Sequence, residues 1–288
     1  MRAMHRDNIY FFHPTRDIGG APYLLARIAR YLIEHTSHRV YLIDYQDGFI
    51  RRRLEGLDYQ FVEFKQGSRV AIEEPATIVQ FLSHVPFINS RLILAETTKL
   101  FFWDMHPYNL VEQMAFSGVY KRMPAENAHR LSSLIEQTRC RKLARFVELG
   151  AASRGVVFMA ERNKDYNQKL LGFSGQVGYL PIPIETSALA KSGGCLKNAD
   201  VDQTIHIGWL SRLDTWKTRV LFRLLDDVDA YRRMHGSGSL HVHIIGDGPK
   251  QNEVQARCTG VNTSVVGRLE DSALSEYMLD HLHVGFAM

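Results

Sequence analysis

Short apolar runs alternate with stretches of helical periodicity along most of the chain. Strands are predicted at residues 9–13, 40–43, 59–64, 91–95, 100–103, 155–159 and 177–180. Helices are predicted at residues 21–34, 75–82, 124–150 (with a break near Thr138) and 160–171. Strands and helices that alternate in this way are typical of parallel sheets with helices on both faces.

The alternation fails at residues 185–203, where small and polar residues dominate, and then resumes. Strands are then predicted at 205–210, 240–245, 264–266 and 284–287, and helices at 217–234, 250–258 and 272–282. We therefore expect an α/β protein with two Rossmann-like domains, residues 1–184 and 204–288, joined by a linker at 185–203. Because no helix follows the last apolar strand, we expect an incomplete second domain, in a truncated chain or one that needs a partner there.

Composition supports a globular protein, with 45% hydrophobic and 23% charged residues among 288. No apolar run reaches the roughly 18 residues of a membrane span, and charged residues interrupt the N-terminal stretch that a signal peptide would need. We therefore expect a cytoplasmic protein. Three distant cysteines predict no disulfide framework, and His241 and His243, which would share one face of a strand, are too few for a metal site.

Positive charge gathers in residues 121–164, which contain ten Lys/Arg and four Asp/Glu. This excess is modest for a nucleic-acid-binding protein, so no nucleic-acid partner is expected, and an anionic ligand or membrane face fits better. Residues 121–147 could lie peripherally on an anionic membrane, or they could form an ordinary solvated helix face. The basic and apolar residues concerned are Arg139, Arg141, Lys142, Arg145, Leu143, Phe146 and Val147.

Two glycines, Gly19 and Gly20, open the first predicted helix directly after the first strand. Such a turn lets a ligand approach the backbone, and its free N–H groups favour anions. One alternative is an ordinary tight turn. The other is a dinucleotide fingerprint with Asp44 as the ribose-binding acid, but only one of the three fingerprint glycines matches, which disfavours a nicotinamide-dependent oxidoreductase.

Three turns of the second domain follow predicted strands: GWLSRLDTWK at 208–217, IIGDGP at 244–249 and VVGRL at 265–269. The carboxyl ends of strands are where ligands bind in open α/β sheets. Arg212 could hold a diphosphate by its guanidinium fork and Lys217 as a point charge, while the Gly-x-Gly turn would leave room for a base or ribose. Alternatively, Arg212 and Lys217 are solvated loop charges.

These motifs resemble those of the family 4 retaining glycosyltransferases, which have the two-domain GT-B fold. The resemblance spans nearly the whole chain, weakly in the first 180 residues and firmly after residue 204. It implies that Arg212 and Lys217 bind the donor diphosphate together with Gly19 and Gly20, which lie in the cleft. It also implies that the acceptor binds mainly to the first domain. The implied nucleoside-binding residues are Gly246, Asp247, Gly248, Pro249, Arg268 and Leu269.

Asp104 and His106 follow the strand predicted at 100–103. Members of this family often have a His or Asp at this strand end, next to the donor sugar. The resemblance therefore implies that His106 or Asp104 acts in catalysis, by hydrogen-bonding a sugar hydroxyl and stabilising positive charge at the anomeric carbon. Alternatively, Asp104 caps a helix that starts near Pro107.

The resulting expectation is a glycosyltransferase that moves a sugar, with retention, from a nucleotide-sugar donor to a glycan or lipid-linked acceptor. Arg212, Lys217 and a helix N-terminus would stabilise the leaving diphosphate, so neither a metal nor a cofactor is expected. The family's Glu-x7-Glu segment, which contacts donor sugar and ribose, would follow Met288, so we expect poor transfer by the chain as given. The alternative is a non-enzymatic nucleotide-binding fragment or degenerate paralogue.

Overall fold

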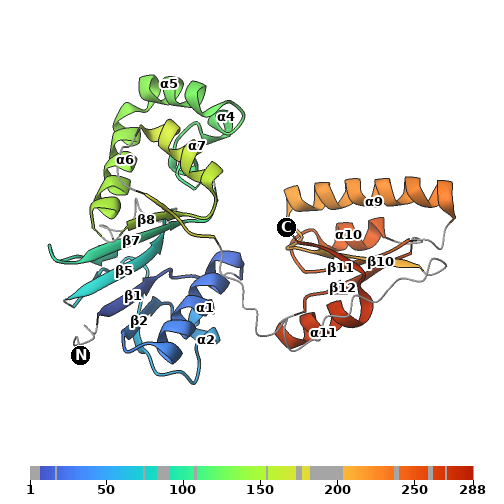
Figure 1. Cartoon of the computed structure of the whole chain (residues 1–288), viewed down its shortest axis with the longest axis horizontal. Helices are drawn as coiled ribbons and strands as arrows, with labels where there is room; N and C mark the ends of the chain where they lie inside the picture. Colours follow the sequence, from blue (N-terminus) through green and yellow to red (C-terminus); the bar gives the residue numbers. More distant parts are fainter. Residues whose placement is uncertain are drawn as a thin grey trace. The chain divides into compact units, whose positions relative to one another are not determined.

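The computed structural model describes residues 7–16, 18–73, 75–82, 91–106, 109–153, 155–172, 177–181, 204–236, 240–258, 262–269 and 271–287. The chain forms two compact units, Met1–Pro183 and Ile184–Met288. Each contains a parallel sheet with helices on both faces (Figure 1), which confirms the predicted α/β class. The expected linker at 185–203 lies outside the described residues.

Seven parallel strands form the main sheet of the first unit, in the order β3-β2-β1-β5-β7-β8-β9. They are β1 (Asn8–Phe12), β2 (Arg39–Asp44), β3 (Gln60–Glu63), β5 (Ala76–Phe81), β7 (Lys99–Asp104), β8 (Gly155–Phe158) and β9 (Gly178–Tyr179). A separate parallel pair joins β4 (Val70–Ala71) to β6 (Leu92–Ile93), so the strand predicted at 91–95 belongs to this small sheet.

Helices cover both faces of this sheet and create a core on each side (Figure 1). One face carries α1 (Gly20–His35) and α2 (Phe49–Arg53); the other carries α4 (Ser117–Tyr120), α5 (Ala125–Ile135), α6 (Gln137–Ala152) and α7 (Glu161–Leu171), with a 3-10 turn η2 (Val111–Gln113). Because successive strand residues point to opposite faces, Phe11 packs with the α1 side and Phe12 with the α6 side.

Residues 75–82 contain the strand β5, so the helix predicted there is wrong. β5 lies between β1 and β7 in the sheet, and all six of its residues are buried. A central parallel strand that is covered on both faces shows no alternation of polar and apolar residues. A short apolar run of this kind is ambiguous between a strand and a buried helix, and the β-branched Thr77, Ile78 and Val79 favour the strand.

The second unit has a four-stranded parallel sheet in the order β12-β11-β10-β13. Its elements are β10 (Ile205–Leu210), α9 (Thr215–His235), β11 (Leu240–Ile245), α10 (Gln251–Arg257), β12 (Thr263–Gly267), α11 (Asp271–His281) and β13 (Val284–Ala287). α9 and α10 cover one face and α11 the other (Figure 1). Every predicted element of this unit is confirmed, with ends that differ by no more than two residues. Among the described residues, no helix is both long and apolar enough to cross a membrane.

Candidate functional site

The three turns predicted to bind a nucleotide meet at the carboxyl edge of the second sheet. Backbone hydrogen bonds connect them: Ser211 N–H donates to the Ile245 carbonyl (3.1 Å), Leu213 N–H to the Asp247 carbonyl (2.7 Å) and Gly246 N–H to the Gly267 carbonyl (2.7 Å). The turns that follow β10, β11 and β12 are therefore one continuous backbone structure. Their side chains extend from the edge at which ligands bind in open parallel sheets.

Gly246 and Gly248 are required by this backbone packing. Both have φ values in the left-handed region, +147° and +151°. A Cβ atom on Gly246 would overlap the Ser211 carbonyl oxygen, and one on Gly248 would lie 2.6 Å from the Leu213 carbonyl oxygen. The neighbouring turn fills the space that a Cβ atom would need, so backbone packing alone accounts for these glycines. That the turn borders a base or ribose stays a prediction.

Two predicted diphosphate ligands surround the start of α9. Arg212 lies in the turn and is exposed, and Lys217 is half-buried in the first helical turn. The Asp214 side chain caps α9 by accepting the Lys217 backbone N–H at 3.0 Å. Since a carboxylate already occupies this helix end, the side-chain cations rather than the helix dipole are the groups that can attract an anion. Their joint binding of a diphosphate stays a prediction.

The remaining predicted nucleoside ligands lie in the neighbouring two turns. Asp247 and Pro249 are exposed in the turn between β11 and α10, while Arg268 and Leu269 are half-buried after β12. The Arg268 guanidinium is 4.0 Å from the Asp247 carboxylate. Beside Arg212 and Lys217, this edge therefore carries a third cation, Arg268, with an acidic partner close by.

Gly19 and Gly20 begin α1 in the first unit and have no steric need to be glycine. Gly19 has an extended backbone (φ −170°), and no side chain of the described residues caps the helix there. A Cβ atom on Gly20 would have nothing within 4 Å, and one on Gly19 would meet only Pro22 at 3.8 Å. In contrast to α9, no carboxylate of the described residues caps the first N–H groups of α1, which suits an anionic ligand.

Asp44 is a structural residue, which removes the support for a dinucleotide site. It is fully buried, and its carboxylate accepts backbone N–H groups from Thr15 (3.0 Å), Tyr45 (2.8 Å) and Arg51 (3.3 Å). A Cβ atom on Gly48 would overlap this carboxylate. Burial raises the pKa of Asp44, against the opposing effect of these hydrogen bonds. With all its lone pairs facing the protein, Asp44 is not placed to bind a ribose.

Asp104 and His106, at the end of β7, have different surroundings. Asp104 is fully buried and accepts hydrogen bonds from the side-chain amides of Asn109 (2.8 Å) and Asn167 (3.2 Å) and from the His106 backbone N–H. The expectation that Asp104 contacts a sugar is therefore wrong for this arrangement. The helix that it was expected to cap would start near Pro107, which lies outside the described residues. His106 is exposed and remains the candidate catalytic residue.

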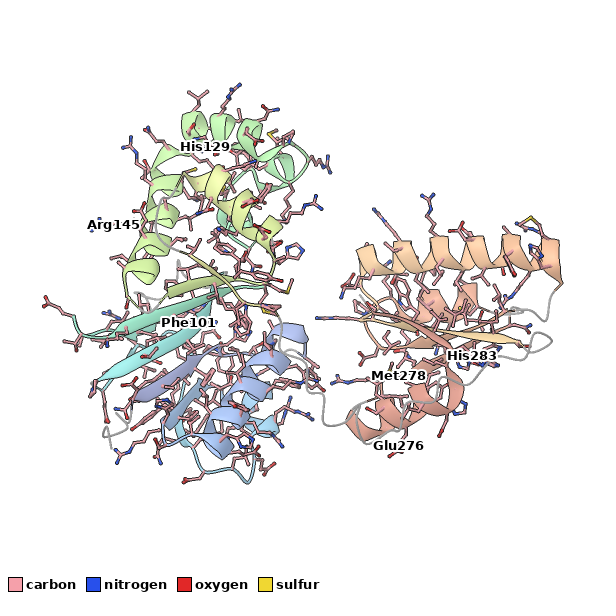
Figure 2. All side chains as sticks on the ribbon, viewed as in Figure 1. Phe101, His129, Arg145, Glu276, Met278 and His283 are labelled. Carbon is pink, nitrogen blue, oxygen red and sulfur yellow. The ribbon has the colours of Figure 1, made fainter. Side chains whose placement is uncertain are left out.

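The basic segment 121–147 presents its charges outward. Arg141, Lys142 and Arg145 of α6 are exposed, and Arg145 points away from the helix (Figure 2). Leu143 and Val147, which would face the lipid if the segment lay on a membrane, are instead buried in the core of the first unit. The apolar side chains that this region exposes are Leu134 (83%) and Ile135 (54%), at the end of α5. The segment therefore combines exposed cations with exposed aliphatic groups.

Five histidines form a cluster on the face of the second sheet that α11 covers; we call them the histidine cluster. They are His206, His241, His243, His281 and His283. His243 Nε2 lies 2.8 Å from His206 Nδ1, and His243 Nδ1 lies 2.8 Å from the Tyr277 hydroxyl. Burial is the main cause that lowers the pKa of His243 to about 4. From the sequence we predicted only that His241 and His243 share one face of a strand.

Acidic and histidine side chains do not form a metal site in the described part of the chain. No group of three or more His, Cys, Asp or Glu side chains there could hold a metal ion. The sequence contains two Asp-x-Asp triplets, at 200–202 and 227–229. The first lies outside the described residues, and in the second Asp229 pairs with Arg232 at 3.2 Å within α9.

Comparison with solved structures identifies the fold. The Anabaena protein HepE, solved in complex with UDP and glucose, matches with a TM-score of 0.51 and 15% identity, over 92% of this chain and 70% of HepE. The lipopolysaccharide outer core galactosyltransferase WaaB, in its apo form, matches with a TM-score of 0.51 and 13% identity, over 95% of this chain and 71% of WaaB. The apo structure of OtsA matches with a TM-score of 0.54 and 10% identity, over 98% of this chain and 77% of OtsA.

Sequence comparison adds no relative, since no protein-family model and no curated protein matches the chain. At these low identities the structural likeness concerns the fold alone. HepE, WaaB and OtsA are GT-B glycosyltransferases with two Rossmann-like domains, and this chain has the same fold.

Proposed function

We propose that this protein is a glycosyltransferase that moves a sugar from a nucleotide-sugar donor to a glycan or lipid-linked acceptor, with retention at the anomeric carbon. The observation that carries the proposal is the joined set of turns at the carboxyl edge of the second sheet, which presents Arg212 and Lys217 beside the start of α9. The complex of HepE with UDP and glucose and the galactosyltransferase WaaB support a nucleotide-sugar donor.

Sugar transfer breaks the bond between the anomeric carbon and the diphosphate, so negative charge develops on the leaving group. Arg212 can hold two phosphate oxygens through its guanidinium fork, and Lys217 adds a point charge. Cations aimed at the leaving diphosphate stabilise the transition state more than the ground state, which is what accelerates the reaction. On this account, the start of α1 at Gly19 and Gly20 binds anionic parts of the ligands, and His106 contacts the donor sugar.

A lipid-linked acceptor fits the exposed basic segment of the first unit. Arg141, Lys142 and Arg145 would attract anionic lipid headgroups, and Leu134 and Ile135 would enter the interface. Sedimentation with anionic vesicles at low and high salt tests this part. We expect binding to anionic vesicles that weakens at high salt and that falls in the double variant Lys142→Glu/Arg145→Glu. Equal sedimentation with anionic and neutral vesicles would contradict a membrane contact.

A panel of nucleotide sugars, with the release of nucleoside diphosphate as the readout, tests the proposal as a whole. One donor should give release that Arg212→Ala reduces strongly, whereas Arg233→Ala, an exposed arginine near the far end of α9, should leave it unchanged. Nucleotide binding without any release would favour the non-enzymatic alternative. Neither binding nor release with any donor would contradict both.

A further inference from the structure

The carboxylate of Asp104 is fully buried, and its hydrogen-bond partners among the described residues are all donors. Its Oδ1 accepts from the Asn109 side-chain amide at 2.8 Å, its Oδ2 from the Asn167 side-chain amide at 3.2 Å, and the His106 backbone N–H also donates to it. A buried carboxylate without partners would be very unfavourable, so these donors account for its presence in the core.

These hydrogen bonds attach both His106 and Asn109 to Asp104. The Asn109 backbone N–H also donates to the His106 carbonyl at 3.1 Å, so these two residues are joined directly as well as through Asp104. On the other side, Asn167 belongs to α7 and also donates to the Asn163 carbonyl at 2.8 Å. Asp104 therefore connects the turn, the sheet and α7.

We propose that Asp104, Asn109 and Asn167 are positioning residues that fix His106 in place, and that they act in sugar transfer only through His106. This inference rests on the proposed function for the role of His106, but the positioning itself does not depend on it. Among the described residues, the groups that donate to Asp104 are the neutral side-chain amides of Asn109 and Asn167 and the His106 backbone N–H. The ionisable residues of segment 106–109 are His106 and Tyr108.

The protonation state of Asp104 controls this arrangement. Because every partner donates, the ionised form suits the site, and a proton on Asp104 would place one donor against another. Burial opposes ionisation and raises the pKa of Asp104 to about 7. The attachment of the His106 turn should therefore weaken as the pH falls below about 7.

Kinetics with the donor found above test the functional part. Asn109→Ala should lower kcat by about tenfold and leave the donor KM within about twofold, because it displaces a catalytic group without removing a substrate contact. The control is Asn127→Ala, an exposed asparagine of α5, which should behave as wild type. The double variant His106→Ala/Asn109→Ala should be no slower than His106→Ala alone. The proposal would be overturned if the double variant lost the product of the two single-variant losses in kcat. It would also be overturned if Asn109→Ala left kcat unchanged.

An NMR titration of the full chain tests the positioning without any substrate. The side-chain amide signals of Asn109 should shift with a midpoint near pH 7 in wild type and in His106→Gln, and should lose this titration in Asp104→Asn. A titration that persists in Asp104→Asn, or is absent in wild type, would overturn the proposal. If the titration is present but no donor is turned over, the proposed function fails and the positioning of His106 stands.

Discussion

The backbone N–H of Leu213 donates a 2.7 Å hydrogen bond to the carbonyl oxygen of Asp247, and this bond joins two turns that lie over 30 positions apart in the sequence. The same two turns bring the positive φ glycines of the β11 turn against the backbone that carries Arg212. The positions of the proposed donor ligands are thus set by main-chain packing, so changes in that packing should reach the ligands.

Gly246→Ala should disrupt this edge of the second sheet. The new Cβ atom would overlap the Ser211 carbonyl oxygen at a φ of +147°, so steric repulsion adds to a backbone strain of about 1–3 kcal/mol. Hydrogen exchange of the β10 and β11 amides should show a large loss of protection. In the control Gly236→Ala, with φ +102° and open space around the Cβ, the loss should correspond to strain alone. Equal effects of the two substitutions would contradict the packing account.

Gly20→Ala should leave the fold intact and weaken ligand binding. Its Cβ atom would meet nothing within 4 Å, and alanine in place of glycine in a helix stabilises by roughly 0.5–1 kcal/mol. Thermal unfolding should therefore show no loss, while the affinity for the anionic ligand falls because a methyl group stands before the first N–H groups of α1. Unchanged affinity would mean that this turn is an ordinary one.

The sequence was informative where local patterns decide the structure. All elements of the second unit were predictable because each strand is short, apolar and bounded by turn residues. The strand β5 could not be predicted, because burial on both faces removes the alternation of polar and apolar residues that distinguishes a strand from a helix. The five-residue helix α2 and the two-residue strand β4 are too short to produce a period.

In the candidate site, too, local features could be predicted from the sequence and long-range contacts could not. The three turns were predictable as glycine- and cation-bearing segments at strand ends, but their mutual hydrogen bonds are long-range. The roles of Asp44 and Asp104 could not be inferred, because a strand-terminal aspartate looks the same in sequence when it binds a ligand and when it accepts buried N–H groups. The histidine cluster draws on two strands, a helix and the residue before β13, a combination that no local spacing shows.

Asp44→Ala should reduce stability, because several backbone N–H groups lose their buried acceptor. A loss of roughly 3 kcal/mol is expected, since each unsatisfied buried group costs about 1–3 kcal/mol. Chemical unfolding of the variant, with the exposed Asp58→Ala as control, measures this loss. A fully stable variant that has lost affinity for a nicotinamide dinucleotide would restore the oxidoreductase alternative.

The histidine cluster should make the second unit sensitive to acid. Burial and neighbouring histidines lower the pKa of His206, His241 and His243 in the folded state, the last to about 4, against about 6.5 when unfolded. The unfolded chain then binds more protons, so stability is full above about pH 6.5 and falls as the pH drops below it. For His243 the fall continues to about pH 4, by up to ~1.4 kcal/mol per pH unit.

Unfolding free energies between pH 7.5 and pH 4.5 measure this dependence. His243→Gln should flatten it, and His235→Gln, an exposed histidine of α9, should not. A stability that does not change over this range, or that rises with acid, would show that these histidines are not held neutral by the fold.

Calorimetric titration of the chain with nucleoside diphosphates and their monophosphates measures whether Arg212 and Lys217 bind a diphosphate. The diphosphate should bind more tightly than the monophosphate. Arg212→Ala should weaken diphosphate binding roughly 10- to 100-fold, because a charge-assisted hydrogen bond contributes about 1.5–3 kcal/mol, while Arg233→Ala should change nothing. Equal affinities for diphosphate and monophosphate, or an Arg212→Ala variant that binds the diphosphate as wild type does, would show that Arg212 and Lys217 do not form a diphosphate site.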